Sequence, residues 1–184
     1  GQEAFDITAV PLQDAVTACV ADFQSAAQTQ GIELTITPPA ATAAATEAAT
    51  EEDPVSVRAD AEGLRTILNN LIDNAIKCTP RGGKVSVQWR RLDDQVVIEV
   101  QDTGIGIPAA HQARIFERFY RVDKARSREL GGTGLGLSIV KHLSQSFGGN
   151  VAVESQPRQG STFRGTLWGT GNGERGTGED EGRK

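Results

Sequence analysis

The chain has 184 residues, an apolar fraction of 38% and a formal net charge of −5, which fits one ordinary domain with room for tails. The acidic balance provides no basic surface of the kind that nucleic acids bind, so we expect no nucleic-acid partner. Cys19 and Cys78 are the only cysteines and lack disulfide or zinc spacing, which favours a reducing compartment. No apolar run of this sequence is long enough to span a bilayer, and we expect neither a membrane span nor a signal peptide within it. The start at Gly1 and the lack of methionine predict an excised piece of a longer protein.

The N-terminal part predicts a helix between two short strands. Residues 3–7 predict the first strand, and Pro11 opens a helix whose apolar residues recur at helical spacing. Gly31 ends this helix, and residues 32–37 predict the second strand. Residues 38–54 are rich in Ala, Thr and Glu and are bounded by prolines, so they predict a low-complexity, mobile loop.

A second helix is predicted to begin after Asp60, a good N-cap residue that follows a strand candidate at 55–59. Proline and glycine residues within 80–83 stop the helix. Two runs of alternating apolar residues, 85–89 and 96–100, are separated by a pair of aspartates and predict a β-hairpin.

A glycine-rich loop at 102–107 follows the hairpin, and a short helical stretch is predicted near 109–118. Residues 121–133 are charged and aperiodic, which predicts a flexible loop, whereas 135–147 predict an amphipathic helix.

A last hairpin, 151–154 with 161–168, is predicted to close a domain that covers residues 1–168. Residues 169–184 consist mainly of glycine and charge, and we expect a disordered tail. Mixed helices and hairpins predict an α+β fold, a two-layer sandwich.

Polar residues recur on one face of the second helix. Asn70, Asn74 and Lys77 stand at i, i+4 and i+7, so they share that face. An asparagine carbonyl oxygen is a suitable ligand for Mg²⁺, and a lysine provides a point charge for a phosphate. A solvated polar face has the same spacing, so this motif alone leaves both interpretations open.

Two glycine-rich motifs have chemistry suited to a nucleotide. In 102–107 (DTGIGI), the carboxylate of Asp102 can accept a hydrogen bond from an exocyclic amine such as that of adenine. In 131–137 (GGTGLGL), glycines at a helix start free backbone N–H groups for phosphates. Neither motif is a dinucleotide fingerprint or a P-loop. A plain turn and a flexible hinge remain alternatives.

A fourth segment, 116–121 (FERFYR), places two phenylalanines, Phe116 and Phe119, before the predicted loop. The aromatic rings can anchor the loop to the core, and Arg121 is placed to reach a terminal phosphate. Core aromatics beside a surface arginine would look the same in isolation.

Together and in this order, the four segments resemble the N, G1, F and G2 boxes of sensor histidine kinases, within the ATPase superfamily of gyrase, Hsp90 and MutL. The resemblance covers residues 60–168, more loosely from residue 5, and is greatest to phosphate-regulon-type sensor kinases. It implies a Bergerat-type fold, in which about three helices cover one face of a mixed sheet, with residues 121–133 as an ATP lid.

The resemblance also implies residue roles. Asn74 would ligate a Mg²⁺ ion that bridges the ATP phosphates, with Asn70 assisting, and Lys77 and Arg121 would contact the phosphates. These four residues form the predicted catalytic set, and Asp102 would hold the adenine amino group. The other predicted nucleotide contacts, which shape the base pocket or let the lid close, are Gly104, Gly106, Ile107, Tyr120, Gly132, Thr133, Gly134, Leu135 and Gly136.

Phe116 and Phe119 would pack the base of the lid. One departure from the family pattern is Cys78, where a tyrosine often stacks near adenine. Neither His111 nor His142 lies in a context that matches the family's acceptor histidine.

The expected function is to bind Mg²⁺–ATP and to donate its γ-phosphoryl group to a histidine on a separate dimerisation domain, for transfer to a response regulator. A monomeric, cytoplasmic part of a membrane-anchored kinase, itself without membrane contact, is expected. Alternatives are a non-catalytic nucleotide-binding module, an ATPase and a serine kinase of the same superfamily. Autonomous hydrolysis is disfavoured, because Asn70 stands where the ATPases have a glutamate that activates water.

Overall fold

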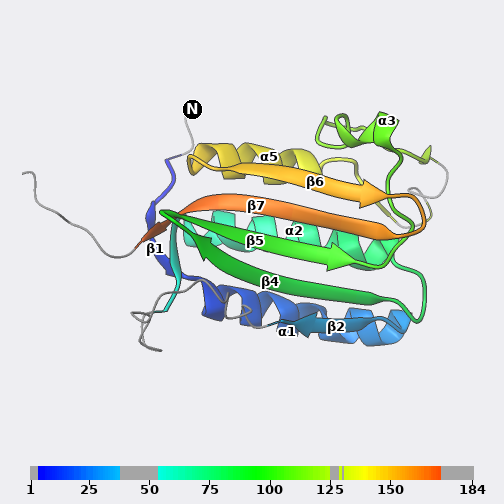
Figure 1. The fold of residues 1–184 in the computed structure, drawn as a ribbon, viewed down its shortest axis with the longest axis horizontal. Coiled ribbons are helices and arrows are strands. Elements are labelled where there is room, and N and C mark those ends of the chain that lie inside the picture. Colours follow the sequence, from blue (N-terminus) through cyan, green and yellow to red (C-terminus); the bar gives the residue numbers. More distant parts are fainter. Residues whose placement is uncertain (1–3, 38–53, 125–128, 130, 171–184) are drawn as a thin grey trace, which may run out of the picture.

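A computed structural model of the chain describes residues 4–37, 54–124, 129 and 131–170. One seven-stranded sheet forms the first layer, and helices α1, α2 and α5 lie against one of its faces (Figure 1). Only β2 and β4 pair in parallel among the pairs in this part of the chain. The mixed sheet confirms the predicted two-layer α+β sandwich.

The strand order is β1-β3-β7-β5-β4-β2, and β6 also pairs with β7. The strands are β1 (Thr8–Pro11), β2 (Glu33–Ile36), β3 (Ser56–Ala59), β4 (Lys84–Leu92), β5 (Gln95–Asp102), β6 (Asn150–Gln156) and β7 (Gly160–Thr170).

The helices follow the predicted periodicity. They are α1 (Leu12–Gln30), α2 (Ala61–Cys78), the short α3 (Ala109–Gln112) and α5 (Gly136–Ser146). The predicted N-cap at Asp60 is confirmed, because its carboxylate accepts the Gly63 N–H at 2.8 Å. No helix of the described segments is long and apolar enough to cross a membrane.

Three boundaries differ from prediction. The first strand begins at Thr8 rather than within residues 3–7, because backbone pairing with β3 (Thr8 opposite Ala59) fixes its position. The predicted helix at 109–118 ends at Gln112 and is followed by turns. β7 continues through Gly169 and Thr170, which pair with β3, so these two residues belong to the sheet and not to the predicted tail.

Most of the predicted mobile loop at 38–54 and the rest of the predicted tail, 171–184, lie outside the described residues. The same holds for residues 125–128 and 130 of the predicted lid.

Asp60 generates a testable pH effect. Its carboxylate accepts the N–H groups of Gly63 and of Asp6, and these bonds hold its pKa below the usual range. A lowered pKa adds stability at pH values above the unfolded-state pKa of about 3.9, and that stability is lost as the pH falls through the folded-state pKa. We therefore expect Asp60→Ala to lower the thermal midpoint at pH 7, with a deficit that shrinks in acid.

The matched control is Asp22→Ala, because Asp22 forms an exposed ion pair with Arg65. Such pairs contribute little to stability, so this variant should have a smaller effect at neutral pH. A deficit for Asp60→Ala that is the same at every pH would contradict the capping role.

Candidate functional site

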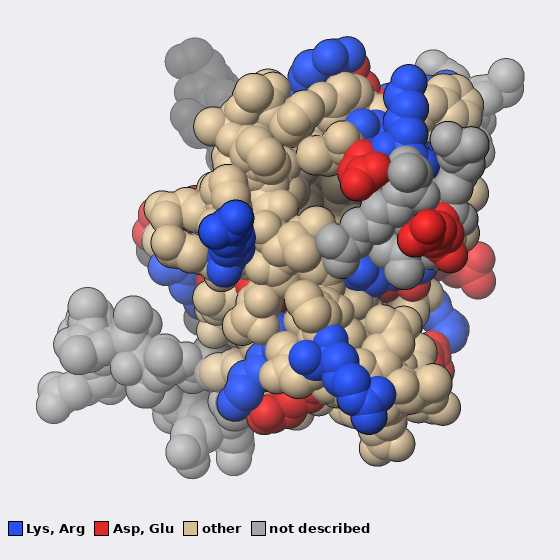
Figure 2. Space-filling view, turned by 90° about the vertical axis from the view of Figure 1, so that its right-hand side faces the viewer, with Lys and Arg blue, Asp and Glu red and all other residues tan. Residues whose placement is uncertain are grey.

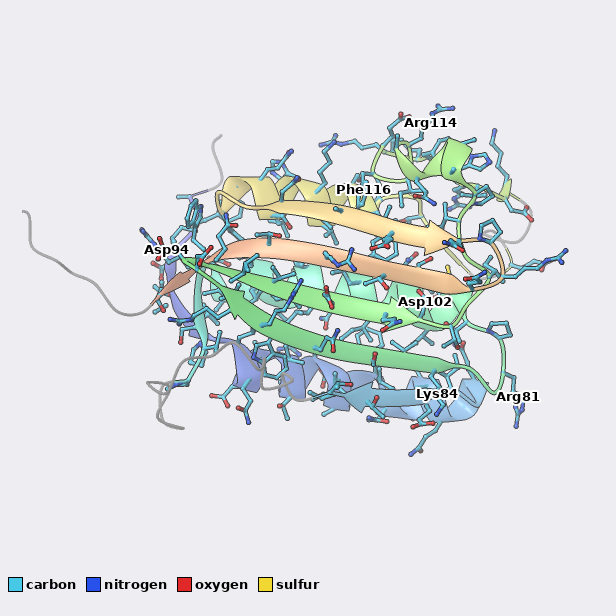
Figure 3. The ribbon with its side chains drawn as sticks, viewed as in Figure 1. Arg81, Lys84, Asp94, Asp102, Arg114 and Phe116 are labelled. Atoms are coloured by element: carbon cyan, nitrogen blue, oxygen red, sulfur yellow. The ribbon has the colours of Figure 1, made fainter. Side chains whose placement is uncertain are left out.

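A cleft of about 320 Å³ lies where the loop after β5 meets α2 and the start of α5. Figure 2 views the molecule from this end, where Lys and Arg side chains lie at the top, the left and the bottom of the view and Asp and Glu side chains lie toward the right. Figure 3 places Asp102 toward the same end of β5, below Arg114. The predicted contact residues that line the cleft are Asn70, Asn74, Lys77, Asp102, Gly106, Ile107, Tyr120, Arg121, Gly132, Thr133, Gly134 and Gly136.

Asp102 is a buried acidic residue of the cleft, with only 3% of its surface exposed. Its Oδ1 atom accepts the N–H groups of Gly104 at 2.9 Å and Ser161 at 3.3 Å. Its Oδ2 atom is buried and has no hydrogen-bond partner. Burial raises the pKa of this carboxyl above its usual range, although the two backbone hydrogen bonds oppose the shift. A buried acceptor without a partner indicates a ligand that brings a donor.

The loop after β5 is held from two sides. A Cβ atom on Gly104 would lie 2.4 Å from the Cys78 carbonyl oxygen, so only glycine fits against the end of α2. Gly106 has a φ of +70°, and a Cβ atom there would lie 1.9 Å from the Gln156 carbonyl oxygen. The Ile105 N–H also donates to the Cys78 carbonyl at 3.1 Å. Gly104 therefore contacts Asp102 through its backbone N–H and does not line the cleft.

The polar face of α2 forms the opposite wall. Lys77 Nζ lies 2.8 Å from Asp73 Oδ2, in a half-buried ion pair within the cleft. Asn70 donates its side-chain amide to the Thr66 carbonyl at 2.9 Å, which leaves Asn70 Oδ1 as an acceptor. A Cβ atom on Gly136 would lie 2.8 Å from that oxygen, so a glycine lets α5 begin against α2.

The start of α5 closes the cleft. Gly134 has a φ of +73°, and its carbonyl accepts the Phe119 N–H at 2.8 Å. The Leu135 N–H donates to Thr133 Oγ1 at 3.3 Å, and Leu135 does not line the cleft. Gly136 and Leu137 do line it, so the cleft lies at the positive end of the α5 dipole.

The aromatic segment has one ring at the cleft, one in the core and one in solvent. Tyr120 lines the cleft, its hydroxyl contacts His111 Nδ1, and the Arg114 guanidinium lies 4.4 Å from its ring centre. Phe116 packs edge-to-face against Phe163. Phe119 is instead 70% exposed and has a φ of +63°. The predicted packing of Phe119 is therefore wrong, because its left-handed backbone turns the side chain outward.

Several cleft residues were missed by sequence reasoning. Ser161 enters through its pairing with Asp102 across β5 and β7, which no local pattern reveals. Asp73 stands beside the predicted polar face, where its i,i+4 spacing to Lys77 was an available signal. The other missed lining residues are Ile105, Ile115, Val122, Asp123 and Leu137, and Cys78 also lines the cleft.

The cleft residues fit a magnesium ion that a phosphate helps to bind. Within the described segments, no group of three or more His, Cys, Asp or Glu residues could form an all-protein metal site. Mg²⁺ usually takes only one or two protein oxygens and completes its shell with phosphate and water. The side chains of Asn70 and Asn74, one helical turn apart in the cleft, provide such oxygens.

Comparison with known proteins assigns the chain to a protein family. Residues 59–170 match the family model described as histidine kinase-, DNA gyrase B-, and HSP90-like ATPase. The sensor-like histidine kinase SenX3 of Mycolicibacterium smegmatis is 40% identical over 158 residues, which cover 86% of this chain and 38% of the relative. The sensor histidine kinase WalK of Bacillus subtilis is 44% identical over 113 residues, 60% of this chain and 18% of the relative. The chain thus spans well under half the length of these relatives.

Solved structures of sensor histidine kinases have the same fold as this chain. The mycobacterial sensor histidine kinase MprB matches with a TM-score of 0.68 and 26% identity, over 90% of this chain and 98% of that one. Full-length ShkA in complex with AMPPNP matches with a TM-score of 0.74 and 28% identity, over 91% of this chain and 32% of that one. The chain therefore belongs to the family of histidine kinase-, DNA gyrase B- and HSP90-like ATPases, and it resembles the sensor histidine kinases within that family.

Proposed function

We propose that the cleft binds Mg²⁺–ATP and that the chain donates the γ-phosphoryl group to a histidine on a separate dimerisation domain. A response regulator would receive the group next. The unpaired Oδ2 atom of Asp102 carries this proposal, because it is a buried acceptor in a cleft that is also lined by the basic side chains of Lys77 and Arg121. The relatives' names and the AMPPNP complex of ShkA support it.

The adenine base would lie against Asp102. Its exocyclic amino group would donate a hydrogen bond to Oδ2, the oxygen of this carboxylate that is buried without a donor. Apolar side chains at the cleft give the ring a dry surface, which strengthens a hydrogen bond made beside them. These apolar residues are Ile105, Ile107, Ile115 and Leu137.

The phosphates would lie between α2 and the start of α5. The helix dipole favours negative charge there, and Lys77 and Arg121 line the same region. Lys77 must leave Asp73 to reach a phosphate, but a partly exposed ion pair contributes only about 0–1 kcal/mol. Lys77 can therefore exchange Asp73 for a phosphate at little cost in free energy.

Asn74 would hold the Mg²⁺ ion through Oδ1, with Asn70 assisting. When bound, Mg²⁺ would neutralise charge on the phosphates. Asn70 is a neutral amide and cannot take a proton from water, which favours transfer to another domain over hydrolysis.

The acceptor must come from outside this chain. Neither His111 nor His142 lines the cleft. His111 is in contact with the Tyr120 hydroxyl, and His142 lies exposed on α5. An incoming imidazole nitrogen would attack the γ-phosphorus of ATP, opposite the P–O bond that breaks to release ADP. The fixed positive groups of the cleft would stabilise the negative charge on the phosphate oxygens.

Asp102→Asn separates the functional role of Asp102 from a structural one. Because the folded-state pKa is raised, the stability that Asp102 provides is fully present below the unfolded-state value of about 3.9 and is lost as the pH rises through the folded-state pKa. Asparagine keeps an oxygen for the N–H groups of Gly104 and Ser161 without a charge. Thermal unfolding at pH 7 should show the variant to be more stable than the parent, with a difference that disappears in acid.

The same variant should bind ATP about ten- to a hundredfold more weakly in calorimetry, because it loses a charged hydrogen bond of roughly 1.5–3 kcal/mol. Lower stability together with unchanged ATP affinity would remove Asp102 from the base site.

Asn74→Ala should abolish the dependence of nucleotide binding on Mg²⁺, because the metal loses its principal protein oxygen. Titrations of ATP with and without Mg²⁺ measure the effect. Asn150→Ala is the control, since Asn150 lies exposed on β6 and does not line the cleft. Parent-like Mg²⁺ dependence in Asn74→Ala would refute the metal role.

Transfer is tested by mixing the chain with a dimerisation-domain fragment that carries an acceptor histidine, in the presence of γ-labelled ATP. We expect acid-labile phosphate on the fragment, and less of it with Arg121→Ala because a phosphate contact is lost. Inorganic phosphate released by the chain alone would show an ATPase. ATP binding with neither product would indicate a binding module.

A further inference from the structure

Cys78 is the last residue of α2, and it lines the cleft. It is half-buried, and its Sγ atom lies 4.0 Å from Oδ1 of Asn74. The proposed phosphotransfer function gives this thiol no role, although it occupies a wall that the nucleotide would contact.

Cys78 and Asp102 line the same cleft. The Cys78 carbonyl accepts the Ile105 N–H, and a Cβ atom on Gly104 would lie 2.4 Å from that carbonyl, so the loop that carries Asp102 rests on this end of α2. Asp102 is 97% buried and its Oδ2 atom has no partner. A group attached to the sulfur would therefore enter a space that already offers a hydrogen-bond acceptor.

Cys19 provides an internal comparison. It lies in the core on α1 with 1% of its surface exposed, and burial raises the pKa of its thiol. Thiolates and not thiols are the nucleophiles in disulfide exchange, so Cys19 should be unreactive in the folded chain. The two cysteines of this sequence thus differ in access to solvent.

We propose that Cys78 is a site of reversible S-thiolation that controls access of nucleotide to the cleft. Its reagent is a small disulfide that carries an amino group. The Cys78 thiolate attacks one sulfur of the reagent, a new S–S bond forms to Sγ, and the S–S bond of the reagent breaks. The departing half takes up a proton and leaves as a free thiol, so the reagent is the only oxidant required.

The negative charge of Asp102 favours a reagent that carries an amino group. The attached ammonium would lie in the same cleft as the unpaired carboxylate oxygen of Asp102 and would replace the adenine amine as donor. An anionic adduct beside Asp102 would be repelled by this carboxylate, whereas Lys77 and Arg121 line the part of the cleft assigned to the phosphates. The proposal rests on the proposed function, because the adduct is inferred to occupy the place of the base.

The test uses the whole chain and cystamine, the disulfide of 2-aminoethanethiol. Peptide mass spectrometry should find the adduct on Cys78 and not on Cys19 while the chain is folded, and on both residues in denaturant. Saturating Mg²⁺–ATP should slow modification of Cys78 at least tenfold. Modified chain should bind ATP at least tenfold more weakly, and reduction with dithiothreitol should restore the affinity.

Two variants sharpen the result. The ATP affinity of Cys78→Ser is measured before and after cystamine treatment, and it should change less than twofold. In Asp102→Asn, the rate with cystamine relative to that with the neutral reagent methyl methanethiosulfonate should fall at least twofold, because the carboxylate no longer attracts the ammonium.

The inference alone is overturned if untreated chain binds ATP but Cys78 resists cystamine, reacts equally fast with and without nucleotide, or carries the adduct with unchanged affinity. An unchanged ratio of reagent rates in Asp102→Asn contradicts the role of charge. If untreated chain binds no ATP, the proposed function is itself contradicted, and this inference falls with it.

Discussion

The site depends on the two faces of helix α2. On one face, Leu64, Leu68 and Leu71 are fully buried against the sheet and its neighbouring helices. Each such side chain contributes about 1.5–3 kcal/mol, so the helix cannot rotate without exposing several of them. The 3.6-residue repeat then fixes where the other face points. Asn70, Asn74 and Lys77 line the cleft because the hydrophobic core leaves them no other direction.

Asp102 shows a conflict between stability and function. The fold fixes one of its oxygens with two backbone N–H groups and leaves the other buried without a partner. Such an arrangement works against folding at neutral pH, as the raised pKa indicates. It is what a ligand site requires, since an acceptor kept from water needs no desolvation when a donor arrives. Local rules of folding are commonly broken at functional sites.

Sequence patterns predicted the parts of the site that depend on short-range geometry. Helical spacing predicted one shared face for Asn70, Asn74 and Lys77, and the cleft contains all three. The capping role of Asp60 followed from its side-chain chemistry alone. Family resemblance added the order of the glycine-rich segments, and those segments meet at the cleft.

Other parts could not be predicted because they depend on contacts between distant segments. Ser161 reaches the cleft through a strand pairing that spans 59 residues of sequence. The first strand lies where β3 pairs with it, and not where local propensity placed it. Phe119 looks like a core residue by composition, but a left-handed backbone and a hydrogen bond to Gly134 direct it to solvent.

The position of β7 has a consequence for how the protein is made. It is the last of the described strands along the chain, yet it pairs with β3, β5 and β6 in the interior of the sheet. On a ribosome, the earlier strands and helices therefore emerge before the strand that joins them. Until β7 arrives, edges of β3, β5 and β6 lack their native neighbour and can pair with other chains. The sheet can therefore be completed only after β7 has been synthesised.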